Sequence, residues 1–371
     1  MDAMYSIINA TYQRNNLLTA SVTATGSESM EIMRSAAEIG SKGYLLVSGT
    51  IIYSISPEQI SAINQSGDNL WTHKTWPDSK VVIFKNCIYC QSVTAQDKLD
   101  IIDSRSGITL TNRPRMPAVD NLKKLIFFQP HETSYLASSL SPSKQKLKDG
   151  KAVTLPPNFV IYCCYNDKRD FIWLAESYDA IHLPIITTPD EKLIIVVTDK
   201  KILIYDANPA QREPSPIRSI DYPLSIVNNI CTDLTGNLCL LGPDNKKDQL
   251  VQCDNSGKLL WKWEHSGIAG ASSIIAIGSN SEVLVCDSSK VFCIKDGKEQ
   301  WNFDCGFSAP EFITTTTDGS VLIAAGDTLF CCKEGRKIFS YDAGASIIAA
   351  PVVDADGNVY ILTHAAIVKV L

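Results

Sequence analysis

Short apolar runs separated by turn-forming residues recur along the chain. Three of these runs follow an Asp, Gly or Asn turn: TDLTGNLCLL around Gly236, TDGSVLIAA around Gly319 and DADGNVYIL around Gly357. Asp-Gly and Gly-Asn pairs between β-branched runs are a hairpin signal. No helical apolar period of comparable strength competes with this pattern. The sequence therefore predicts an all-β chain built from antiparallel hairpins.

A glycine followed four positions later by an aromatic residue marks a repeat. The spacing from Gly257 to Gly297 is 40 residues, from Gly297 to Gly335 is 38, and from Gly67 to Gly107 is 40. A fixed period in this range indicates a solenoid, an array or a propeller. The residues that define the structural repeat are Gly67 with Trp71, Gly257 with Trp261, Gly297 with Trp301, and Gly335 with Phe339.

Each repeat reads as a four-stranded meander, and such units repeated around an axis are the blades of a β-propeller. We predict a single domain over residues 1–371, an eight-bladed β-propeller with seven blades as the fallback. Residues 113–157 are predicted to be an irregular insertion or a degenerate blade. The stretch Ala118–Pro184 decides the blade number, because one blade with an insertion gives eight and two blades give nine.

The last repeat supplies three strands and stops at Leu371. An unpaired strand edge at this point would be exposed to pairing with other chains. We therefore predict that an N-terminal strand within residues 1–42, near Tyr5–Tyr12, pairs with the C-terminal blade and closes the ring.

The repeat resembles that of the PQQ-like (pyrroloquinoline-quinone-type) propeller family, whose blades carry the pattern D-x-x-G-x-x-x-W. The resemblance is strong over Ser225–Leu371, moderate over Gly43–Pro114 and weak between them. It implies that the aromatic residue of each repeat docks in the seam between neighbouring blades, where a large ring buries much area. The family includes quinoprotein dehydrogenases, the lipoprotein of the outer-membrane barrel-assembly machinery and many binding domains, so the resemblance implies a fold more than a function.

Charge and hydropathy narrow the range of partners. The formal net charge is -6 and the charges are mixed along the chain, so the basic stripe that nucleic acid requires is missing. No run of 18 apolar residues occurs, and the N-terminus lacks the pattern of a secretory signal. We expect no nucleic-acid partner, no membrane insertion and a cytoplasmic location, or a periplasmic one if a leader was removed.

Twelve cysteines raise the question of metal, redox or disulfide chemistry. The C-x-x-C pair Cys87 and Cys90 lies in an apolar run, where residues three apart on an extended strand face opposite sides. Metal or redox use of this pair would need a turn. By the same alternation, the adjacent pairs Cys163-Cys164 and Cys331-Cys332 are each expected to place one thiol on each side of a sheet.

Three further cysteines, Cys253, Cys293 and Cys331, each lie four residues before a repeat glycine. Packed sheets are about 10 Å apart, whereas a disulfide needs Cα atoms about 4.4 to 6.8 Å apart. Equivalent positions on successive blades are therefore not easily bridged. We predict that these cysteines are reduced and act as small packing residues.

The resemblance also raises PQQ-dependent oxidation, which in the dehydrogenases uses a calcium ion and a vicinal-disulfide lid over the quinone. Both vicinal cysteine pairs fall inside predicted strands rather than on a loop, and the chain is much shorter than those enzymes. The five histidines form no zinc-ligand spacing, and His73 and His265 are expected at strand ends. We predict no cofactor and no metal.

Two acidic pairs, Glu311 with Asp318 and Asp354 with Asp356, have the composition of glycosidase carboxylates. Asp318 and Asp356 fall in the repeated turn, where an Asx-turn explains them without a reaction. Because no G-x-S-x-G elbow, P-loop or dinucleotide fingerprint occurs, we predict no catalytic residue and no enzyme activity.

A rigid propeller offers two loop faces on which partner segments bind, by strand addition or in grooves. We predict a non-catalytic scaffold that mediates protein-protein interaction, with Trp76, His131 and Tyr135 as partner contacts beside the insertion. A periplasmic outer-membrane assembly factor and a PQQ-dependent dehydrogenase are the alternatives. The oligomeric state is not determined by the sequence.

Overall fold

The chain folds as repeated antiparallel β-sheets. The computed structural model describes residues 17–18, 29–34, 43–76, 79–84, 86–91, 99–110, 122–127, 135–140, 145–148, 151–154, 159–164, 171–177, 183, 186–190, 192–207, 215–244, 247–269, 274–306 and 308–371. Strands, turns and bends account for the regular structure of these residues, so the predicted all-β class is confirmed. Within the same ranges, no helix is long and apolar enough to span a bilayer.

Most sheets have four strands that are consecutive in the chain and paired in sequence order. Their strands are β3 (Tyr44–Ser48), β4 (Ile51–Ile55), β5 (Gln59–Ile63) and β6 (Asn69–Lys74); β16 (Ile186–Thr187), β17 (Leu193–Val197), β18 (Lys201–Asp206) and β19 (Arg218–Asp221); β20 (Asn229–Thr232), β21 (Leu238–Asp244), β22 (Lys247–Cys253) and β23 (Leu259–Glu264); β24 (Ile275–Ile277), β25 (Val283–Cys286), β26 (Lys290–Lys295) and β27 (Lys298–Asp304); and β28 (Phe312–Thr316), β29 (Ser320–Ala325), β30 (Thr328–Lys333) and β31 (Arg336–Asp342).

Three further sheets complete the series. They contain β7 (Lys80–Phe84), β8 (Cys87–Gln91) and β9 (Leu99–Asp103); β10 (Leu122–Phe127), β11 (Tyr135–Leu140), β14 (Phe159–Cys164) and β15 (Phe171–Ser177); and β32 (Val352–Val353), β33 (Val359–Leu362) and β34 (Ala366–Val370), which is joined by β2 (Ser29–Arg34).

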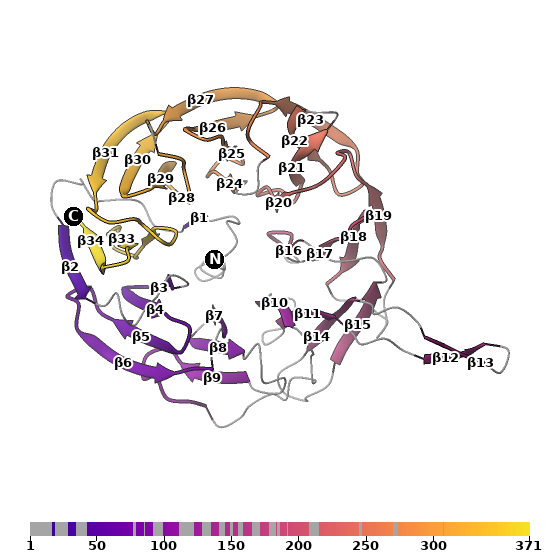
Figure 1. Cartoon of the computed structure of the whole chain (residues 1–371), viewed down its shortest axis with the longest axis horizontal. Coiled ribbons are helices and arrows are strands. Elements are labelled where there is room, and N and C mark those ends of the chain that lie inside the picture. The colour runs from indigo at the N-terminus through magenta and orange to yellow at the C-terminus, as the bar shows by residue number, and fades with distance from the viewer. Residues whose placement is uncertain are drawn as a thin grey trace.

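The sheets follow one another around a common centre, and in the consecutive four-stranded sheets the first strand lies nearest the centre and the last at the rim (Figure 1). In the final sheet the strand at the rim is β2. Side chains are more buried on the middle strands of a sheet than on the strand at its rim. The middle strand β29 is buried at every position, whereas the rim strand β23 is mostly exposed. Middle strands are covered on both faces by neighbouring sheets, so they read as continuous apolar runs instead of alternating ones.

The core lies between successive sheets. One buried cluster joins Ile195 and Ile204 of β17 and β18 to Leu238 and Val251 of β21 and β22. A second joins Leu241 of β21 to Val283 and Val285 of β25, and a third joins β25 and β26 to β29 and β30. The sheets β20–β23 and β24–β27 therefore each supply one face to the core before them and the other face to the core after them.

The first and last sheets also share a core. Leu45 and Ile52 lie in one buried cluster with Tyr360 and Leu362, which are about 300 residues later in the sequence. The backbone N–H of Ala355 donates to the carbonyl of Gly49 at 2.9 Å. Residues that are remote in the chain are therefore adjacent in space.

An N-terminal strand does pair with the last sheet, but it is β2 and not a strand near Tyr5–Tyr12. β2 pairs antiparallel with β34, from Ser29 opposite Val370 to Arg34 opposite Ala366. The other edge of β34 pairs with β33, so β2 occupies the edge predicted for the earlier segment. Tyr5–Tyr12 itself lies outside the described residues. A short strand, β1 (Leu17–Leu18), pairs in parallel with the innermost strand β28.

The stretch Ala118–Pro184 contains one four-stranded sheet and one separate hairpin. Strands β12 (Gln145–Lys148) and β13 (Lys151–Thr154) pair only with each other among the described strands, and they interrupt the sheet between β11 and β14. In Figure 1 this hairpin lies well outside the circle of sheets. We call residues 145–154 the outer hairpin.

Candidate functional site

The repeated aromatic residues lie on the rim strands, against the glycine turn of the next sheet. A Cβ atom added to Gly297 would lie 3.1 Å from Cβ of Trp261, and one added to Gly335 would lie 3.0 Å from Cβ of Trp301. At the first seam, an added Cβ on Gly107 would lie 2.6 Å from Cδ2 of Trp71. The glycine of one repeat thus provides room for the aromatic residue of the repeat before it.

The four repeat glycines share a backbone conformation that disfavours other residues. The φ angles are 90° at Gly67, 86° at Gly257, 72° at Gly297 and 73° at Gly335. A side chain in this left-handed region costs about 1 kcal/mol or more. Phe339, the aromatic residue of the last of these repeats, is buried in the cluster between β28–β31 and the final sheet.

One seam uses an aliphatic side chain where the others use a ring. A Cβ atom added to Gly257 would lie 2.7 Å from Cγ2 of Ile220, on the rim strand β19. Ile220 was not predicted, because the repeat was recognised by its aromatic side chains. Its only sequence signal is its interval to Gly257, which is 37 residues and close to the 36 residues from Trp261 to Gly297.

The glycine-based alignment of the three repeated cysteines is wrong for Cys253. In the sheet register, Trp301 lies opposite Cys293 and Phe339 lies opposite Cys331, but Trp261 lies opposite Gln252. The turn after Cys253 runs from Asp254 to Lys258, whereas the later turns have two residues. The longer turn shifts the register by one residue and puts Cys253 on the other face of its sheet.

The vicinal pair Cys331-Cys332 and the C-x-x-C pair Cys87 and Cys90 adopt the strand geometry that the sequence predicted, whereas the side chains of Cys163 and Cys164 lie outside the described part of the structure. Cys331 lies in the cluster after its sheet and Cys332 in the cluster before it, so the two thiols point to opposite sides. Cys87 and Cys90 both lie within β8, without a turn between them. The structure shows ten of the twelve cysteines, all except Cys163 and Cys164, without a disulfide bond, and nine of these ten are buried; the exception is Cys87, which is half-buried.

Native alkylation should distinguish Cys87 from the buried thiols. Burial raises the pKa of Cys293 and Cys331 to about 12, which leaves almost no thiolate at pH 8. We expect brief iodoacetamide treatment, read by peptide mass spectrometry, to label Cys87 first among the described cysteines. The unfolded chain in guanidinium is the control, in which all twelve should react. Labelling of Cys293 as fast as Cys87 in the native protein would contradict the buried packing role.

The acidic residues of the repeated turns are used to hold those turns. Oδ1 of Asp318 accepts from the backbone N–H of Ser320 at 3.3 Å, which is the predicted Asx-turn. In the last sheet the turn is anchored by Asp354 and not by Asp356: Oδ1 of Asp354 accepts from the N–H groups of Asp356 and Asn358. In each of the two acidic pairs, one carboxylate therefore has a structural role in its turn.

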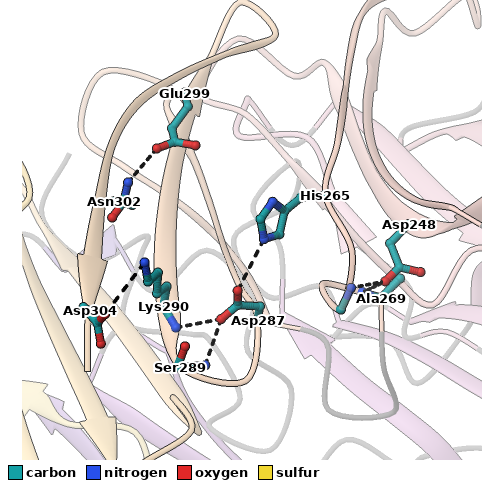
Figure 2. A network of polar contacts seen from close by, with 10 residues as sticks. Asp248, His265, Ala269, Asp287, Ser289, Lys290, Glu299, Asn302 and Asp304 are labelled. Atoms are coloured by element: carbon teal, nitrogen blue, oxygen red, sulfur yellow. Dashed lines mark hydrogen bonds and ion pairs between the residues drawn. The ribbon is translucent and has the colours of Figure 1, made fainter. Parts of the chain in front are cut away.

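A hollow lies on the edge that carries the β21–β22 turn and the β23–β24 connection, and it is lined by Lys247, Asp248, Glu264, His265 and Ser266. Figure 2 shows the contact between His265 and Asp287 beside it. His265 Nε2 is 3.3 Å from Oδ2 of Asp287, on the next sheet. The imidazole stacks on Trp263 at 5.3 Å and lies 4.4 Å from the ring of Phe292. Three contacts thus hold the His265 ring in place. His265 directly follows the last residue of β23, so it lies at the end of its strand as predicted, and His73 is the residue before the last one of β6.

Asp287, the partner of His265, and Asp248, which lines the hollow, both accept hydrogen bonds from nearby backbone N–H groups. Burial raises the pKa of Asp287, but the N–H groups of Ser289 and Lys290 and the His265 contact lower it further, to below its usual value. Oδ2 of Asp248 accepts from the N–H groups of Gly267 and Ala269. The hollow measures about 320 Å³, and the described residues include no group of three His, Cys, Asp or Glu side chains that could hold a metal.

A second hollow lies on the opposite edge, between the β24–β25 turn and the β28–β29 turn. It measures about 280 Å³ and penetrates to Cys293 and Trp301 in the seam. Three carboxylates and one lysine line it. This hollow was not predicted from the sequence. Its lining residues come from two repeats, and the turns among them are interpreted from the sequence as structural.

The predicted partner contacts are only partly within the described residues. Trp76 is half-buried after β6, where its carbonyl accepts from the N–H of Ser79 at 3.1 Å. Tyr135 begins β11, and His131 lies outside the described residues. These three residues remain predictions.

Comparison with known proteins assigns no family to the chain. No protein-family model matches it, and no curated protein matches it. Among solved structures, it is similar to a crystal structure of a protein of unknown function from Bacteroides caccae, with 15% identity and a TM-score of 0.38, over 55% of this chain and 78% of that one.

Proposed function

We propose that the sheets are the blades of a closed eight-bladed propeller that acts as a non-catalytic scaffold for protein-protein interaction. Closure is supported by the core shared between the first and last sheets and by the pairing of β2 with β34. The number eight follows from treating each sheet around the centre as one blade and the outer hairpin as an insertion. Such a ring is rigid and presents its turns on two faces.

The outer hairpin is the observation that carries the scaffold proposal. A two-stranded hairpin alone is marginally stable in water. Among the described strands, β12 and β13 have no neighbour on their outer edges, so each offers a row of backbone groups for strand addition. A partner that pairs with either edge would stabilise the hairpin.

The charge of the outer hairpin indicates the chemistry of its partner. Its strands read QKLK and KAVT, with Lys146, Lys148 and Lys151, and Asp149 lies between them in the sequence, so residues 145–154 carry a formal charge of +2 (three lysines less one aspartate) in a chain whose formal net charge is -6. Lys148 lies opposite Lys151 in the register. Like charges at adjacent positions repel, and an acidic partner segment relieves that repulsion.

Charge reversal in the outer hairpin should weaken partner capture about tenfold. Each exposed ion pair contributes about 0.5 kcal/mol, so three give about 1.5 kcal/mol. The tagged full chain is used as bait in extract from its own cells, and a protein recovered in stoichiometric amount is quantified for the wild type and for Lys146→Glu/Lys148→Glu/Lys151→Glu.

The matched control reverses three exposed lysines elsewhere, Lys258→Glu/Lys298→Glu/Lys337→Glu, next to the repeat glycines on the rim. We expect this control to retain the partner. Equal capture by both triple variants, or no stoichiometric partner at all, argues against the scaffold proposal.

A further inference from the structure

The 280 Å³ hollow described above, which we call the seam cavity, exists because two small residues replace a larger hydrogen-bonded pair. In the preceding sheet, Gln252 is buried and its Nε2 donates to Oδ2 of Asp233 at 2.9 Å. The residue that matches Gln252 in the next sheet is Cys293, since each lies opposite the seam tryptophan of its own sheet. The matching residue for Asp233 is glycine.

Turn geometry establishes the second match. The N–H of Asp233 donates to the carbonyl of Asn237, and the N–H of Gly278 donates to the carbonyl of Glu282, so the two residues begin equivalent turns. Cysteine and glycine together lack most of the side-chain volume of glutamine and aspartate. Part of the space that the pair fills in one repeat is taken up in the next by the carboxylate of Glu282, whose Oε2 would lie 2.7 Å from a Cβ atom added to Gly278. The rest is open, with Trp301 in its wall.

The lining of the seam cavity carries an excess of negative charge. Glu282, Asp318 and Glu334 line it, with Lys333 as the one cation among the lining residues. Lys333 Nζ lies 3.6 Å from Oδ2 of Asp318. Glu282 is held in place by the N–H and Nδ2 of Asn280, at 2.9 and 3.0 Å, and the carboxylate keeps further acceptor capacity.

We propose that the seam cavity receives the guanidinium group of an arginine side chain from the partner polypeptide. The guanidinium is planar and weakly hydrated, binds carboxylates through two parallel hydrogen bonds, and stacks on aromatic rings. A carboxylate rim above an aromatic wall matches each of these properties. An ammonium group is hydrated more strongly and does not stack, so lysine fits less well. The inference rests on the scaffold function and adds a side-chain pocket to it.

The probe for this site is N-acetyl-L-arginine amide, titrated into the full chain by calorimetry. A ligand of this size should bind with a dissociation constant in the millimolar range. N-acetyl-L-citrulline amide, which has nearly the same shape without the charge, should bind at least tenfold more weakly. The difference isolates the contribution of the carboxylates.

Two variants of the cavity locate the binding. Cys293→Gln restores the side chain found in the preceding repeat and should fill the space, with at least a tenfold loss of affinity. Glu282→Gln keeps the volume and removes one charge, with a loss of about threefold to tenfold. Glu264→Gln is the control, because Glu264 lines the other hollow, and it should bind like the wild type.

Several results would overturn the assignment. They are equal binding of the arginine and citrulline probes, unchanged affinity in both cavity variants, absence of binding up to 20-fold above the expected constant, or preferential binding of a neutral sugar such as glucose. If Cys293→Gln fails to fold, Glu282→Gln decides. The probe is independent of partner capture, so loss of the scaffold function and loss of this pocket are separate outcomes.

Discussion

Gly107→Ala is expected to lower the free energy of unfolding by about 2–5 kcal/mol. The residue has a φ of 70°, where an added side chain costs about 1–2 kcal/mol. Its new Cβ would also lie 2.6 Å from Cδ2 and 2.8 Å from Cγ and Cε3 of Trp71. Overpacking of this kind adds about 1–3 kcal/mol. Equilibrium urea unfolding followed by tryptophan fluorescence measures the sum.

Moving the indole of Trp71 away from the added methyl group would cost free energy, because the ring is held by a hydrogen bond. Its Nε1 donates to the carbonyl of Ser104 at 3.2 Å, and the hydroxyl of Tyr53 donates to the same carbonyl at 3.0 Å. Ser104 lies in the same turn as Gly107, so the turn is bound to the ring that its glycine accommodates. Displacement of the ring breaks a buried hydrogen bond as well as the packing.

Gly344→Ala separates the two contributions. Gly344 has a φ of 64°, but an added Cβ would meet no atom within 4 Å. The free energy of unfolding of the Gly344→Ala variant should therefore fall only by the cost of the strained backbone, about 1–2 kcal/mol. In addition, Trp71→Ala should make Gly107→Ala less harmful in a double-mutant cycle. If the two glycine variants lose the same stability, the glycine does not serve the aromatic residue of the neighbouring sheet.

Local patterns in the sequence were sufficient to predict the strands and the seams that use an aromatic residue. Apolar runs, Asp-Gly turns and the interval from Gly297 to Trp301 depend only on residues close in the chain, and each recurs in several repeats. The structure has these strands and turns at the expected places. Pairing register is less local, because a turn that is longer by a few residues moves Cys253 to the opposite face.

Contacts between repeats could not be predicted in the same way. The seam cavity depends on what Cys293 and Gly278 lack relative to Gln252 and Asp233, and this comparison needs the register of both sheets. The N-terminal strand that pairs with the last sheet was predicted at the wrong residues for a similar reason. The sequence before residue 43 contains several segments that could form a strand, and only the pairing with β34 shows that β2 is the one that does. Residues 113–157 were predicted to be an irregular insertion or a degenerate blade, but the hairpin formed there by β12 and β13 was not predicted.

Asp354 joins the first and last sheets through hydrogen bonds to one carboxylate. Its Oδ2 accepts from Gln65 Nε2 at 2.7 Å, from Asn358 Nδ2 at 2.8 Å and from the hydroxyl of Tyr360 at 2.8 Å. Gln65 lies in the turn before β6, 289 residues earlier in the chain. Asp354 is fully buried, so water does not replace a lost partner.

Asp354→Asn is therefore expected to lower the free energy of unfolding by about 2–4 kcal/mol at pH 7. An amide NH₂ placed at Oδ2 would face the amide donors of Gln65 and Asn358, and a flipped amide would instead face the backbone N–H groups. Asp254→Asn is the matched control. Asp254 accepts its bonds from Ser256 and Lys258 at Oδ1 alone, which asparagine retains, so little change is expected.

The pH dependence of this difference supplies a second check. Burial raises the pKa of Asp354, but the hydrogen bonds from Asn358, Gln65 and Tyr360 lower it further, to below its usual value. A lowered folded-state pKa means that the stabilisation is complete above the carboxyl's ordinary pKa of about 4 and is lost as the pH falls below it. Urea unfolding at pH 7, 5, 4 and 3 should show the gap between wild type and Asp354→Asn closing only below pH 4. A gap that is constant with pH, or absent at pH 7, would mean that this carboxylate does not hold the first and last sheets together.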